Sequence, residues 1–110
     1  MSRSNLPRVM SKLGSRPQRL PKDYKERQEL VGERLRTGKT LKVAAVLRDL
    51  AWHKHRDHLT KKDTDQFRQG RDRLASELAL VLGSEISDME QMIDNALEVS
   101  IVGVRQPAVT

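Results

Sequence analysis

Tyr24 lies among cationic residues, an arrangement of side chains suited to contact with nucleic acid. Lys22, Lys25 and Arg27 surround it in the sequence. A flat ring can insert at an unstacked base step while neighbouring cations hold the phosphates. A second interpretation stays open, because Tyr24 also begins an apolar stripe at helical spacing. Spacing alone favours placing its ring in the core.

Three histidines, His53, His55 and His58, raise the question of a metal site. Residues two apart on a helix do not share a face. No carboxylate is placed to complete a ligand set, because Asp57 points elsewhere. We expect a solvated, cationic helix end that can meet phosphates, with no bound metal and no other cofactor.

The sequence has no pattern typical of catalysis. It contains no nucleophile elbow, glycine-rich phosphate loop or HExxH motif. The acidic residues are interpreted as helix caps or as partners of neighbouring Lys and Arg, and Asp49 beside Arg48 is interpreted as structural. The absence of cysteine excludes disulfides, thiolate chemistry and Cys-ligated zinc. We therefore expect a binding module and not an enzyme.

Charge is unevenly distributed along the 110 residues, which are enough for one domain. Residues 1–62 hold 17 Lys or Arg against 6 Asp or Glu, whereas residues 63–110 hold 4 against 9. A basic half of this kind favours a polyanionic partner. No apolar run approaches the roughly 20 residues that span a bilayer, and the basic N-terminus lacks the apolar stretch of a signal peptide. We expect a cytoplasmic, nucleoid-associated protein without membrane contact.

Apolar residues at helical spacing predict an all-α fold, a compact bundle of four to five helices. Residues 1–22 form a basic segment with a short helix over 6–13, capped by Asn5 and ended by Gly14. A linker over 15–21 follows. Because Trp52 follows the apolar face of its helix, we expect it to pack in the core.

Local signals predict the longer helices. Asp23 caps a helix over 24–36. Apolar residues at i, i+3, i+4, i+7 spacing, Val43, Val46, Leu47 and Leu50, predict a second helix over 40–56. Thr60 and Asp63 form a capping box for a helix that continues to residue 82 and ends at Gly83. A second capping box, from Ser87 to Glu90, predicts a helix over 88–99. Residues 100–110 are interpreted as a tail, either frayed or forming a strand that needs a partner.

The stretch KVAAVLRDL at residues 42–50 resembles the C-terminal helical domain of the CarD/CdnL family. Residues 35–38 ahead of it, and Arg71, Leu74 and residues 77–79 behind it, share the resemblance, which covers about residues 5–99. Members are bacterial regulators that bind RNA polymerase and stabilise the open promoter complex. The resemblance implies a helical domain over 23–99. It also implies that the family's Tudor-like β-domain, which binds the polymerase β subunit, is absent from this chain.

The resemblance also implies a role for Tyr24. In the family, a Trp at the start of the second helix wedges into the minor groove at the upstream edge of the promoter bubble. Matching back from Lys42 without gaps places Tyr24 at that position. Two neighbouring family positions that are basic hold Glu26 and Glu29 here. The residues expected to contact promoter DNA, at its minor groove and phosphates, are Tyr24, Arg27, Lys25, Lys22, Arg19 and Arg16.

A second function class stays open from the charge pattern. The acidic helices after residue 63 could be the working face of a protein-interaction adaptor, with the basic half merely solvated. The salt dependence of DNA binding separates the two alternatives, because binding through phosphates weakens steeply as salt rises.

Overall fold

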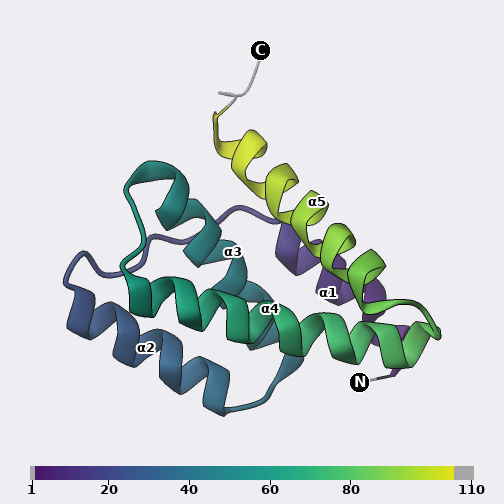
Figure 1. The fold of residues 1–110 in the computed structure, drawn as a ribbon. Coiled ribbons are helices and arrows are strands. Elements are labelled where there is room, and N and C mark those ends of the chain that lie inside the picture. The colour runs from purple at the N-terminus through teal and green to yellow at the C-terminus, as the bar shows by residue number, and fades with distance from the viewer. Residues whose placement is uncertain (1, 106–110) are drawn as a thin grey trace.

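Helices account for all the regular structure in the described part of the chain, residues 2–105 of the computed structural model (Figure 1). This confirms the predicted all-α class. The elements, in chain order, are a 3-10 turn at Arg3–Asn5, α1 at Leu6–Gly14, α2 at Tyr24–Arg36, α3 at Thr40–Arg56, α4 at Lys61–Leu82 and α5 at Ile86–Arg105.

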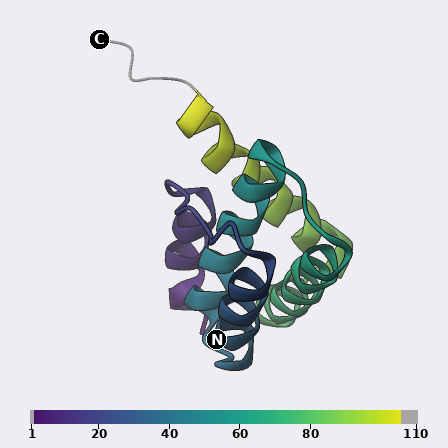
Figure 2. The ribbon, with the colours of Figure 1, turned by 90° about the vertical axis from the view of Figure 1, so that its left-hand side faces the viewer.

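Helix α3 is the centre of the bundle, because it packs against each of the other four α-helices. Figure 2 shows α1 on one side of α3 and α4 on the other, and α5 packs against both α1 and α4. One stripe of α3 forms the centre of the hydrophobic core, and each of its side chains is at most 2% exposed: Val43, Val46, Leu47 and Leu50. This is the i, i+3, i+4, i+7 pattern that marks the buried face of a helix.

The predicted caps hold the starts of α2 and α4. The Asp23 carboxylate accepts a hydrogen bond from the Glu26 amide at 3.0 Å. Thr60 and Asp63 form the complete capping box, since each side chain accepts from the other residue's backbone amide. Gly83 ends α4 in the left-handed conformation, with φ at 64°. These signals set the bounds of the helices that carry the candidate site.

The prediction that Asn5 caps α1 is wrong. The preceding 3-10 turn runs directly into the helix, so Asn5 already has helical backbone angles. Its side chain makes no capping hydrogen bond. An N-cap needs an extended backbone for its side chain to reach back to the first free amides, and the turn removes that geometry.

Helix α5 is longer than predicted at both ends. It begins at Ile86, so Ser87 lies inside the helix and the expected capping box at this residue is wrong. It also continues to Arg105, which corrects the prediction of a frayed tail or strand for residues 100–105. The hydroxyl of Ser100, a buried residue, donates to the Ser15 carbonyl at 2.6 Å and ties this part of the helix to the body. The rest of the predicted tail, residues 106–110, lies outside the described residues.

Trp52 was expected to pack in the core, and this prediction is wrong. It is partly exposed and stacks against His55, with ring centroids 5.6 Å apart. Two residues correspond to about 200° around a helix, so Trp52 points away from the core face that holds Leu50. None of the helices described in residues 2–105 combines the length and apolar character needed to cross a membrane.

Candidate nucleic-acid interface

Tyr24 is the first residue of α2, and its side chain stands in solvent. It is 52% exposed, which overturns the interpretation that its ring belongs to the core. The Asp23 cap fixes the helix start immediately before it. The ammonium of Lys25 lies 6.0 Å from the ring centroid, at the outer limit of a cation–π contact. An aromatic ring with a cation beside it therefore projects from the head of the helix.

The segment between α1 and α2, residues 15–23 (the linker), presents its cations to solvent along a fixed path. Leu20 is 5% exposed and anchors the linker in the core. The Gln18 amide donates to the Asp49 carboxylate of α3 at 2.8 Å. The side chains of Arg16, Arg19 and Lys22 are exposed. The structure thus brings these three predicted residues onto one segment that leads to Tyr24.

A buried polar network on α3 holds the start of the linker. Arg48 and Asp49 form an ion pair at 2.9 Å, with both side chains almost fully buried. Arg48 also donates to the Ser15 hydroxyl at 2.8 Å. Ser100 of α5 donates to the Ser15 carbonyl. These contacts confirm the structural interpretation of Asp49 and show why the linker follows α3.

Arg27 does not take the place expected for it on the surface. It is 3% exposed. Its Nε and Nη2 donate to the two carboxylate oxygens of Asp63 at 3.1 and 2.7 Å. Its Nη1 donates to the carbonyls of Pro21 and Lys22 at 3.3 and 3.0 Å. All three guanidinium nitrogens are therefore used inside the protein, and we assign Arg27 to positioning the linker instead of to phosphate contact.

The pKa values of two titratable groups beside Arg27 are shifted by their surroundings. Burial opposes ionisation of Asp63, but hydrogen bonds from Arg27 and Thr60 outweigh it, so the pKa of Asp63 lies below its ordinary value. Burial lowers the pKa of His53, and the nearby Arg27 charge lowers it further. The cluster joins the start of α2, the end of α3 and the start of α4 at one end of the molecule.

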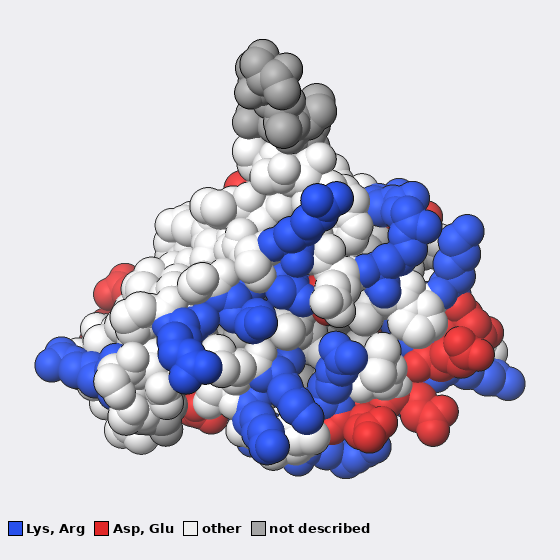
Figure 3. All heavy atoms as spheres, turned by 180° about the vertical axis from the view of Figure 1, so that it is seen from behind, with Lys and Arg blue, Asp and Glu red and all other residues white. Residues whose placement is uncertain are grey.

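Lys and Arg side chains gather on the face opposite α4 and α5. Figure 3 shows them spread across the middle of that face, while Asp and Glu side chains collect mainly along one edge. Figure 2 places α1 on this side of the bundle. The uneven charge of the sequence is therefore expressed as a cationic face in the folded molecule.

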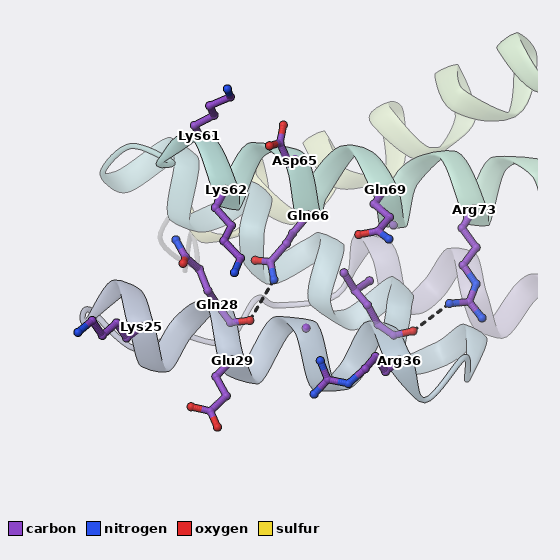
Figure 4. Close-up of a pocket in the computed structure, with 13 residues that line it drawn as sticks. Lys25, Gln28, Glu29, Arg36, Lys61, Lys62, Asp65, Gln66, Gln69 and Arg73 are labelled. Atoms are coloured by element: carbon purple, nitrogen blue, oxygen red, sulfur yellow. Dashed lines mark hydrogen bonds between the residues drawn. The ribbon is translucent and has the colours of Figure 1, made fainter.

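A groove between α2 and α4 adds cations that the sequence reasoning missed. The two helices run side by side in the same direction, and Figure 4 shows the groove between them. Gln66 donates to the Gln28 carbonyl at 3.0 Å, and Arg73 to the Leu35 carbonyl at 2.9 Å. The Lys61–Lys62 pair directly after the Thr60 cap was the local signal that could have indicated it. The cationic residues that line it are Lys25, Arg36, Lys61, Lys62 and Arg73.

The three histidines do not converge. His53 is buried beside Arg27, whereas His55 and His58 are exposed. Among the residues whose side chains are described, no three His, Asp or Glu side chains are grouped as a metal ion would require. One histidine is therefore structural, and the other two lie on the surface.

One family profile matches most of the chain. The profile described as "CarD, C-terminal domain" matches residues 8–94. The chain belongs to the CarD C-terminal domain family. A comparison with curated proteins finds no match. The matched range includes the linker and the whole of α2, α3 and α4, and membership gives this CarD domain a role connected with transcription.

Proposed function

We propose that this CarD domain binds promoter DNA and stabilises the open complex of RNA polymerase. Tyr24 lies against a distorted minor-groove step at the upstream edge of the bubble. Arg16, Arg19, Lys22 and Lys25 hold the flanking phosphates. The observation that carries the proposal is the exposed Tyr24 ring at the head of α2, reached by a linker whose cations face solvent.

The base step at which the duplex begins to part is where an inserted ring stabilises most. Unstacking a step costs a few kcal/mol, and an inserted apolar ring lowers that cost where the duplex is already opening. Tyr24 has only to cover the exposed base, because its helix start is fixed by the Asp23 cap. A surface already ordered in the free protein loses little conformational freedom on binding.

The phosphate contacts supply affinity without sequence information. Each phosphate that a Lys or Arg neutralises releases counterions, so binding weakens steeply with salt. Lys61 and Lys62 at the start of α4 share the groove with Lys25, and they extend the cationic surface beyond the linker. The affinity of the domain alone is expected to be low.

Tethering to polymerase completes the proposed mechanism. A second domain of the family type, docked on the polymerase β subunit, would hold this domain beside the upstream fork. Such a link converts the second binding event into an intramolecular one, at an effective concentration set by the connection. Weak contacts to DNA are then sufficient to favour the open complex.

The alternative of an acidic adaptor is less well supported. Arg71 of α4 donates to Glu90 at 2.5 Å and to Asp94 at 2.6 Å, both on α5. These two acids therefore join helices of the same chain instead of presenting free charge. The cationic face has no comparable internal use for the exposed Arg16, Arg19 and Lys22, which favours the nucleic-acid function.

The test compares forked and fully paired DNA of the same sequence at low salt, by fluorescence anisotropy. Tyr24→Ala is expected to weaken forked DNA about tenfold and duplex much less, since stacking on one base is worth about 1–3 kcal/mol. Leu80→Ala is the matched control, because Leu80 is 86% exposed on α4 and takes no part in the proposed surface. Equal loss on both substrates would reject the wedge. No binding at low salt would favour the adaptor.

A further inference from the structure

Trp52 and His55 form an aromatic pair on the surface of α3 that no core contact explains. The ring planes meet at 27° with centroids 5.6 Å apart, so the two rings are stacked. Trp52 is partly exposed and His55 is exposed. Trp52 does not belong to the hydrophobic core or to the apolar residues packed against it. The imidazole holds the indole in one orientation, which gives a preformed flat surface.

The pair lies on the side of α3 that the linker follows. Arg48, one turn before Trp52 on the same helix side, donates to Ser15 of the linker. Arg56, one turn after Trp52, continues the same row and is exposed. The aromatic pair is therefore bordered by an exposed guanidinium on its own helix, on the side of the bundle where the linker presents its cations.

The end of α3 also lies close to the start of α2. Arg27 of α2 acts on the neighbouring His53, whose pKa it lowers, and pairs with Asp63 of α4. Figure 1 shows the end of α3 and the start of α2 at the same side of the molecule. The helix end that carries the aromatic pair and the helix start that carries Tyr24 therefore lie on the same side of the molecule (Figure 1).

We infer that Trp52, with His55 behind it and Arg56 beside it, stacks an unpaired base of single-stranded DNA next to the fork. The inference rests on the proposed function and names a second, separate contact. An aromatic face bordered by cations is the arrangement that binds single strands without sequence preference. Bases in an intact duplex are already stacked on both faces, whereas an unpaired base has a face free to stack on the indole, so the ligand is the parted strand.

The chain has one Trp, so Trp52 itself reports the contact. Oligothymidylate is titrated into the full chain at low salt, with intrinsic fluorescence and anisotropy of a labelled strand measured together. Stacking quenches indole emission, so the single strand is expected to quench Trp52 strongly and a matched duplex only weakly. Trp52→Ala is expected to weaken single-strand binding by roughly 5- to 100-fold, and Leu80→Ala to leave it unchanged.

Two outcomes overturn the inference. One is unchanged Trp52 emission at a strand concentration where anisotropy shows saturation. The other is absence of single-strand binding at low salt. The emission measurement uses the unaltered protein, so it holds even if Trp52→Ala unfolds. Tyr24→Ala separates this contact from the proposed function: it should abolish the preference for forked DNA while single-strand quenching of Trp52 persists.

Discussion

The buried ion pair of Arg27 and Asp63 offers a perturbation whose size follows from the structure. Their side chains are 4% and 0% exposed, and the shortest contact is 2.7 Å. Arg27→Met keeps an unbranched apolar stem and removes the guanidinium, which leaves a buried carboxylate without its cation. Removing one partner of such a pair costs about 3–5 kcal/mol. Since a domain of this size has a total stability of about 5–15 kcal/mol, the loss is a large share.

The assay is urea unfolding at pH 7, followed by circular dichroism and checked by thermal melting. Each kcal/mol shifts the melting temperature of a domain near 100 residues by about 4–8 °C, so Arg27→Met is expected to melt at least about 12 °C lower. Asp63→Asn keeps an oxygen for the Thr60 amide but removes the charge. The double variant should therefore lose less than the sum of the single losses, with a coupling of about 1–3 kcal/mol.

A DNA measurement completes this test of Arg27. At a temperature where Arg27→Met is folded, its plot of log affinity against log salt should keep the wild-type slope, because the guanidinium contacts no phosphate. Arg19→Gln, at an exposed position of the linker, should reduce the slope by about 1. Wild-type stability together with a reduced slope for Arg27→Met would refute the reasoning and show that this side chain faces DNA.

Two further predictions concern pH and backbone geometry. The pKa of His53 is lowered, so the unfolded chain binds more protons below pH 6.5 and stability falls as pH drops below that value. His53→Gln should therefore reduce the change of the urea midpoint between pH 7.5 and 5. An unaltered pH profile would contradict this prediction. Gly38 and Gly83 both have positive φ, but a Cβ at Gly38 would lie 2.7 Å from Arg73 Nη2 whereas nothing lies within 4 Å of one at Gly83. Gly83→Ala should cost about 1–2 kcal/mol. Gly38→Ala should cost more in the same unfolding assay, because Arg73, which donates to the Leu35 carbonyl, would have to move; equal losses would show that it moves at no cost.

Local signals in the sequence were sufficient for α2, α3 and α4: apolar residues at helical spacing marked α3, and caps marked α2 and α4. Asp23, Thr60 and Gly83 act through backbone groups within four residues, so their effect does not depend on the rest of the fold. The C-terminal half of α5 has no such signal. Its continuation past Ser100 is accompanied by a hydrogen bond to Ser15, which is 85 residues away in the chain, and no local pattern reveals that partner.

The same distinction limited what could be predicted for the candidate site. Lys25 and Arg27 are both cations in the first turn of α2, yet one is exposed and the other buried. The partner that buries Arg27 is Asp63, 36 residues further along the chain. Composition predicted a cationic surface, whereas the division between surface and structural cations depends on contacts between helices.

Two buried aspartates determine how the linker presents its cations. Asp49 accepts from the Gln18 amide near one end of the linker. Asp63 holds Arg27, which donates to the Pro21 and Lys22 carbonyls near the other end. Two buried acidic residues therefore hold the linker in place, so that its cations form an ordered surface. Because that surface is ordered before any ligand arrives, binding requires less conformational ordering than a free basic segment would, and this distinguishes the linker from a merely solvated run of charge.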